Sequence, residues 1–75
     1  MKKQCVDILQ HMEINGSITD LEAYMIYHIR RLASRVHDLK KMYGYNVGSV
    51  WETSVNAAGE PVRYKRYFLI KGESE

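Results

Sequence analysis

The side chains with the most specific chemistry are basic and polar residues that recur at helical spacing between residues 30 and 42. Those that fall on one face of a helix through this stretch are Arg31, Ser34, Arg35, Asp38 and Lys41. An arginine can bind O6 and N7 of guanine together, which gives ~1–3 kcal/mol of discrimination between bases. A lysine suits phosphate better, because its point charge fixes position without reading sequence. The stretch therefore has the chemistry of a nucleic-acid recognition helix.

A second basic group lies near the carboxyl end of the chain. Arg63 and Lys65 share one face of an expected strand, whereas Arg66 points to the other face and is the weaker candidate. We expect Arg63 and Lys65 to follow a DNA backbone or enter a minor groove. The candidate nucleic-acid contacts are then Arg30, Arg31, Ser34, Arg35, Asp38, Lys40, Lys41, Arg63 and Lys65. Asp38 could accept a hydrogen bond from a cytosine amino group or orient Arg35 from one turn away, and we favour the second role.

The formal net charge of +2 hides an uneven distribution. Residues 1–29 sum to −2, and residues 72–75 sum to −2. Residues 30–71 carry nine basic side chains against three acidic ones, a sum of +6. Positive charge concentrated in one helix and one hairpin is typical of a polyanion-binding surface, although lysines and arginines also solvate most small domains.

The sequence gives little support to an enzyme or a metal site. Ser34 and His37 lie one helical turn apart, but no acid is placed to orient the histidine and no oxyanion donors are evident. The histidines His11, His28 and His37 have no ligand-like spacing with each other or with Cys5. We therefore expect no catalysis, no metal and no cofactor.

A chain of 75 residues is expected to form one small domain, over residues 1–71, with a flexible acidic tail at 72–75. The single cysteine excludes an internal disulfide, so a reducing cytoplasm is the expected compartment. No apolar run approaches the ~20 residues of a membrane span, and no signal-peptide core follows the amino terminus.

The apolar pattern predicts three helices. The first covers 3–14, buries Cys5, Ile8, Leu9 and Met12, and ends at Asn15-Gly16. The second begins at a capping box, Thr19-Asp20-Leu21-Glu22, buries Leu21, Tyr24 and Met25, and ends near Tyr27 or His28. The third covers about 30–42 and buries Leu32, Val36, Leu39 and Tyr43.

From Tyr45 the apolar period changes from helical to two, which predicts a hairpin of strands 45–55 and 62–70 around an Asn56–Gly59 turn. A four-residue loop would place Val55 opposite Glu60. The same register places Glu52 opposite Arg63, Trp51 opposite Tyr64, and Val47 opposite Phe68. The hairpin is longer than a three-helix core, so its distal half, with Trp51 and Tyr64, must contact a partner or lie in solvent.

The order of elements, and three runs of residues, resemble the small winged helix-turn-helix domains common in phage and prophage proteins. The runs are Gly16-Ser17-Ile18-Thr19-x-Leu21-Glu22-Ala23, Arg31-Leu32-Ala33-Ser34-Arg35-Val36-x-Asp38-Leu39-Lys40 and Gly44-Tyr45-Asn46-Val47, and the ending Arg63-Tyr64-x-Arg66-Tyr67 also fits. The resemblance covers residues 3–70 and implies an α+β winged helix-turn-helix fold, with 30–42 as recognition helix and 56–59 as wing tip. The chain departs from the family at the corner, where Tyr27-His28 stands in place of the usual glycine.

Two functions remain open. The first is a DNA-binding module, either a small phage-type transcriptional regulator or an excisionase-like factor, acting in the host cytoplasm. The second is a protein-interaction module that binds or inhibits a host protein through the basic helix or the hairpin, with Trp51 and Tyr64 as candidate contacts. The same two aromatic residues could instead be covered in a homodimer.

Overall fold

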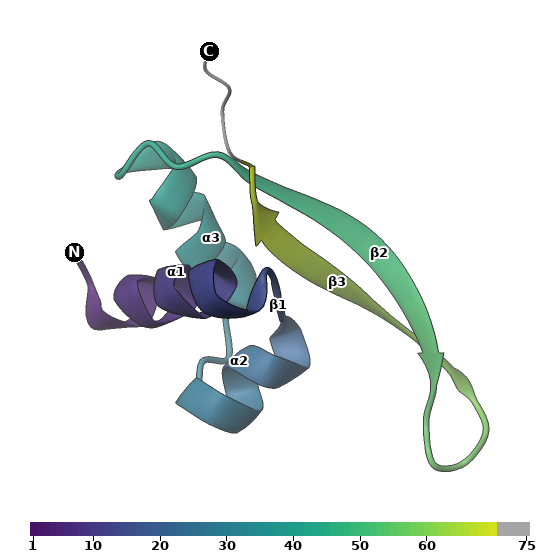
Figure 1. The fold of residues 1–75 in the computed structure, drawn as a ribbon. Helices are drawn as coiled ribbons and strands as arrows, with labels where there is room; N and C mark the ends of the chain where they lie inside the picture. Colours follow the sequence, from purple (N-terminus) through teal and green to yellow (C-terminus); the bar gives the residue numbers. More distant parts are fainter. Residues whose placement is uncertain (71–75) are drawn as a thin grey trace.

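The backbone forms three helices followed by a β-hairpin, which confirms the predicted α+β winged helix-turn-helix arrangement (Figure 1). The computed structural model describes residues 1–70, so the predicted tail at 72–75 and domain end at 71 lie outside the described residues. Its elements are α1 (Lys3–Asn15), β1 (Ile18–Thr19), α2 (Asp20–Tyr27), α3 (Leu32–Lys41), β2 (Val47–Val55) and β3 (Pro61–Leu69). The three strands form one antiparallel sheet in the order β1-β3-β2.

The hydrophobic core lies between α1, α3 and the base of the sheet. The predicted stripe of α1 is confirmed, because Cys5, Ile8, Leu9 and Met12 are buried. In α3, Leu32, Val36 and Leu39 are buried as predicted, whereas Tyr43 lies beyond the end of the helix and is half-buried. Ile18, Val47 and Tyr67 cover this core from the strands, and Tyr43 packs against its edge. Burial of a leucine or isoleucine contributes ~1.5–3 kcal/mol, so α3 is firmly held on one side and presents its other sides to solvent.

The junction between α1 and α2 follows the predicted cap chemistry. Gly16 adopts a left-handed backbone with φ 91°, and its N–H donates to the carbonyl of Met12 over 2.8 Å. The capping box of α2 is complete: the Thr19 hydroxyl accepts from the Glu22 amide over 3.2 Å, and the Glu22 carboxylate accepts from the Thr19 amide over 2.9 Å. These contacts satisfy amides that a helix start otherwise leaves without partners.

The prediction for the buried face of α2 was wrong. Leu21 and Met25 are 66% and 67% exposed and Tyr24 is 44% exposed, whereas Ala23 is fully buried. The core beside α2 is filled by Ile18 before the helix and Ile29 after it. A helical apolar stripe indicates which side chains share a face, but not that another element covers that face.

The corner after α2 forms without a glycine. His28 takes the left-handed conformation with φ 59°, and its N–H donates to the carbonyl of Tyr24. The next amide, of Ile29, donates to the carbonyl of Ala23 over 3.1 Å. This is the hydrogen-bond pattern with which glycine usually ends a helix, and burial of Ile29 accompanies it. The predicted end of α2 near Tyr27 or His28 is confirmed.

The third helix is shorter than predicted. It covers Leu32–Lys41 rather than 30–42, and Arg31 is its N-cap residue. The Arg31 carbonyl accepts from the amides of Ser34 and Arg35, but φ −120° and ψ 64° place Arg31 itself outside the helix. Arg30 and Arg31 therefore belong to the link between α2 and α3, because the corner at His28 and the burial of Ile29 fix the chain just before them.

The hairpin register is shifted by one residue from the prediction. Val55 pairs with Pro61, Glu52 with Tyr64, Trp51 with Lys65, and Val47 with Leu69. The loop has five residues, Asn56–Glu60, because the Asn56 carboxamide oxygen accepts from the amides of Ala58 and Glu60 and so includes Glu60 in the turn. Pro61 then begins β3, a strand position that tolerates the missing N–H.

Candidate nucleic-acid interface

The candidate contacts predicted from the sequence fall into two groups on different sides of α3. Arg30, Arg31 and Arg35 surround a hollow with Gln4 and His28, which we call the arginine hollow. Lys40 and Lys65 line a groove between α3 and the hairpin, which we call the lysine groove. The remaining lining residues of the lysine groove are Ala33, Val36, His37, Val47, Ser49 and Tyr67.

In the arginine hollow, charge is partly neutralised and partly immobilised. A carboxylate oxygen of Asp38 lies 3.3 Å from the Arg35 guanidinium and 3.4 Å from the Lys2 ammonium. The side chains of Arg35 and Asp38 are only 25% and 16% exposed. The Cys5 thiol contacts the Arg35 carbonyl over 3.9 Å, so this side of α3 faces the first turns of α1. The predicted pair between Arg35 and Asp38 is present, and it holds the guanidinium in place.

Arg30 and Arg31 are exposed at the entrance of α3. The Arg30 guanidinium lies 5.8 Å from the centroid of the Tyr24 ring, a cation–π arrangement that links it to α2. Ser34 is half-buried. The arginine hollow therefore presents two exposed guanidinium groups beside a third that is fixed by its ion pair.

The side of α3 that faces solvent most openly carries Ala33, His37, Lys40 and Lys41. Ala33 and His37 were not among the predicted contacts, although Ala33 precedes Lys40 by about two helical turns and His37 precedes it by about one. A helical wheel alone could not choose between this face and the face of Arg35 and Asp38. The choice depends on where α1 lies, because α1 covers the second of them.

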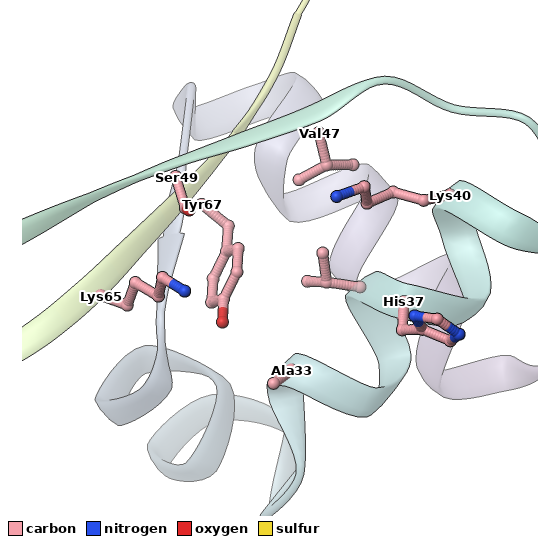
Figure 2. Close-up of a pocket in the computed structure, with 8 residues that line it drawn as sticks. Ala33, His37, Lys40, Val47, Ser49, Lys65 and Tyr67 are labelled. Atoms are coloured by element: carbon pink, nitrogen blue, oxygen red, sulfur yellow. The ribbon is translucent and has the colours of Figure 1, made fainter.

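The lysine groove has a volume of about 220 Å³ and combines two cationic walls with hydroxyl groups. Figure 2 shows the ammonium ends of Lys40, from α3, and Lys65, from β3, directed into the space around the Tyr67 ring. No aspartate or glutamate lines the groove among the described residues. The groove is therefore positively charged without local compensation.

On the hairpin, the shifted register places Trp51, Arg63 and Lys65 on one face. The Arg63 guanidinium lies 4.7 Å and the Lys65 ammonium 5.3 Å from the Trp51 ring, distances at which each cation is attracted to the aromatic face. The indole thus holds two cations of the nominated set beside each other. Arg63 and Lys65 share a face as predicted.

Tyr64 lies on the opposite face of the hairpin, so the predicted pair of Trp51 with Tyr64 was wrong. There Tyr64 is opposite Glu52, and Arg66 binds the Glu52 carboxylate over 3.0 Å and the Ser17 hydroxyl over 2.9 Å. The hydrogen bond from Arg66 lowers the pKa of the Glu52 carboxyl below its usual value. The predicted ion pair of Glu52 with Arg63 is therefore replaced by one with Arg66.

A mostly apolar groove of about 540 Å³ opens on this opposite face, between the start of α2 and the distal hairpin. Leu21, Val55, Val62 and Tyr64 contribute its apolar walls. The side chains of Tyr24, Met25 and Ile26 on α2 are also exposed. The prediction that the apolar face of α2 is buried had missed this apolar surface.

Residues 1–70 also bear on two other classes of feature, a metal site and a membrane span. No group of three or more His, Cys, Asp or Glu side chains gathers there in a way that could hold a metal ion. His11 is instead buried, with Nδ1 2.9 Å from the Tyr27 hydroxyl. None of the helices in this part of the chain is long and apolar enough to cross a membrane.

Comparison with known proteins agrees with the fold. A family model described as "Winged helix-turn-helix domain" matches residues 3–72, nearly the whole chain. No curated protein and no solved structure matches the chain significantly. A domain of this kind suggests DNA binding.

Proposed function

The chain belongs to the winged helix-turn-helix domain family, and we propose that it binds double-stranded DNA with α3 in the major groove and the hairpin along the backbone. The observation that carries this proposal is the lysine groove: Lys40 and Lys65, from two different elements, converge where no carboxylate compensates them. A site where two elements present unneutralised cations favours the binding of a polyanion.

The two sides of α3 have different tasks in this proposal. Arg30 and Arg31, at the start of α3, reach base edges, with Ser34 as a further hydrogen-bonding group. Asp38 orients Arg35 rather than accepting from a base, since its carboxylate is bound by Arg35 and Lys2. Lys40, Lys41, Arg63 and Lys65 contact phosphates, which fix the position of the domain on the duplex.

The biological role that we propose is a small phage-type transcriptional regulator or an excisionase-like factor in the cytoplasm of a host cell. The support is the resemblance of residues 3–70 to domains common in phage and prophage proteins, together with the small size of the domain. Selection of bound duplexes from a random pool tests this role. A defined sequence, in which Arg31→Ala relaxes the preference at one base position, is the expected result.

Binding itself is tested with a fluorescently labelled duplex of random sequence, by anisotropy at about 50 mM and about 200 mM salt, a range over which phosphate contacts lose most of their affinity. We expect a complex at micromolar protein in low salt and steep weakening in the higher salt. A matched control is Lys3→Ala, which removes one exposed lysine of α1 and should change affinity little. Absence of any complex at micromolar protein in low salt would contradict the proposal.

A protein-interaction module is the second candidate, and the apolar groove beside α2 favours it. Leu21 and Tyr64 line that groove, and the exposed Met25 follows Leu21 by one turn of α2. A host protein or a second copy of the chain could cover it. If Leu21→Ser and Tyr64→Ser abolish biological activity while Arg31→Ala and Lys65→Ala preserve it, this second candidate replaces the first. Size-exclusion chromatography with light scattering shows whether the partner is a second copy.

A further inference from the structure

We infer that the lysine groove holds a single phosphate of the DNA backbone, shared between Lys40 of α3 and Lys65 of β3. The inference rests on the proposed function and sharpens it, because the sequence nominated Lys40 and Lys65 on different elements without relating them to each other. A shared phosphate would tie the recognition helix and the hairpin to one point on the duplex.

Lys40 and Lys65 line one and the same groove. Lys40 and Lys65 stand on opposite walls, and their ammonium ends are directed into the same space (Figure 2). Val36 and Val47 line the groove beside the hydrophobic core to which they belong. A phosphate that entered would therefore meet cations on two sides, which is how point charges bind a phosphodiester.

The surrounding charges leave both ammonium groups available. Among residues 1–70, no carboxylate lies within ion-pair distance of Lys40 or Lys65. Asp38 binds Arg35 and Lys2, and Glu52 binds Arg66. The charge of Asp20 acts on the Tyr67 phenol, but Asp20 does not line the groove. The charges of Lys40 and Lys65 therefore meet in a groove that has no carboxylate in its lining.

Hydroxyl donors complete the site, and Lys65 is already positioned for it. Tyr67 and Ser49 line the groove, and burial followed by the charge of Asp20 raises the pKa of the Tyr67 phenol, so it remains a protonated donor. The Lys65 ammonium lies 5.3 Å from the Trp51 ring and 5.8 Å from the Tyr67 ring. Contacts with two rings restrict the lysine before DNA arrives, which lowers the entropy cost of binding.

A double-mutant cycle tests the sharing directly. The affinity for the random-sequence duplex is measured for the wild type, Lys40→Ala, Lys65→Ala and the double variant, over a series of salt concentrations. If the two lysines hold one phosphate, the remaining lysine still neutralises it in either single variant, so the logarithmic salt slope falls by much less than about 0.9 there, and only the double variant lowers it by about 0.9. The loss of affinity in the double variant then differs from the product of the single losses by at least about threefold, which contacts to separate phosphates would not give.

The chain offers a matched control in Lys41, an exposed lysine of α3 outside the groove. The losses of affinity from Lys41→Ala and Lys65→Ala should multiply in the paired variant, because Lys41 does not share the phosphate. All variants should keep the wild-type melting curve, because neither Lys40 nor Lys65 belongs to the core. Lys65→Gln, which keeps most of the aliphatic stem against Trp51, replaces Lys65→Ala if the latter melts early.

The outcomes separate this inference from the proposed function. A wild type that binds DNA, with additive loss from Lys40→Ala and Lys65→Ala, overturns the shared phosphate and leaves DNA binding intact. A wild type that does not bind overturns both. Titration with inorganic phosphate at constant ionic strength, followed by the ammonium NMR signals of Lys40 and Lys65, should show no saturation at submillimolar phosphate. Saturation there would identify a free-phosphate site and overturn the assignment to DNA.

Discussion

The arginine hollow and the lysine groove lie on different sides of the same helix, and they use positive charge differently. In the arginine hollow, Asp38 binds Arg35 and Lys2, and the Arg30 guanidinium rests near the Tyr24 ring. In the lysine groove, Lys40 and Lys65 have no acidic partner among the described residues. In the first region an ion pair fixes the Arg35 guanidinium while Arg31 is exposed, and the second region concentrates charge.

This difference matches the two requirements of DNA recognition. Base discrimination needs oriented, multidentate donors, whereas affinity needs uncompensated charge near phosphates. Under the proposed function, base contacts therefore lie on the side of Arg31 and backbone contacts on the side of Lys65. We expect substitutions on the two sides to differ in their effects on sequence preference and on affinity.

The largest expected effect comes from reversing charge in the lysine groove. Lys65→Glu should weaken binding of a random-sequence duplex on the order of tenfold, since it removes a phosphate contact and adds repulsion. Anisotropy titration at low salt measures the loss. Lys3→Glu makes the same change of net charge on α1 and should cost less than about twofold. Equal losses in the two variants would mean that only net charge matters and that the groove has no special role.

A smaller effect is expected at the indole that holds the hairpin cations. Trp51→Ala should weaken duplex binding by roughly two- to fivefold, because each exposed cation–π contact is worth ~0.5–1 kcal/mol. Trp51→Phe keeps an aromatic face and should recover part of the affinity. If Trp51→Ala binds as well as the wild type while its melting curve is unchanged, the ring does not position Arg63 and Lys65 for DNA.

Sequence patterns predicted the parts of this fold that depend on local chemistry. The stripe from Cys5 to Met12, the glycine cap at Gly16 and the capping box at Thr19 all involve residues close along the chain, and all are confirmed. The family resemblance agrees with the arrangement of the elements. These features can be predicted without knowing which helices and strands pack against each other.

Features that depend on distant contacts were predicted less well. The exposed face of Leu21 and Met25 follows from Ile18 and Ile29 filling the core, which helical spacing cannot reveal. The orientation of Arg35 follows from the position of α1. The hairpin register was missed by one residue because the Asn56 side chain accepts from two loop amides and lengthens the turn. That single residue moved Trp51 from the face of Tyr64 to the face of Lys65.

The corner that positions the arginine hollow can be tested through stability. His28 occupies a left-handed conformation that favours glycine, so His28→Gly should raise the free energy of unfolding by about 0.5–1 kcal/mol. Urea denaturation measures the change, and His28→Ala, which lacks that backbone freedom, should not be stabilised. A less stable His28→Gly would show that the imidazole, which packs edge-on against Tyr24, outweighs the backbone effect.

The smallest expected effect concerns pH and the opposite face of the hairpin. The hydrogen bond from Arg66 lowers the pKa of Glu52 in the folded protein. A carboxyl whose pKa is lower in the folded than in the unfolded state contributes stability above its unfolded pKa, and this contribution disappears as pH falls through the folded value. Melting curves between about pH 6 and pH 3 should therefore fall slightly less for Glu52→Gln than for the wild type. Identical slopes would indicate that the Glu52–Arg66 pair has no energetic role.

The location of DNA on the domain is the most direct test of the account. Backbone amide NMR signals of the wild type, followed during titration with a random-sequence duplex at low salt, report which surface the duplex covers. We expect the largest shifts at His37 and Lys40 of α3, and at Ser49 and Lys65 of the hairpin, with smaller shifts at Arg31. Shifts confined to Leu21, Met25 and Tyr64 would contradict it and would place the binding surface in the apolar groove.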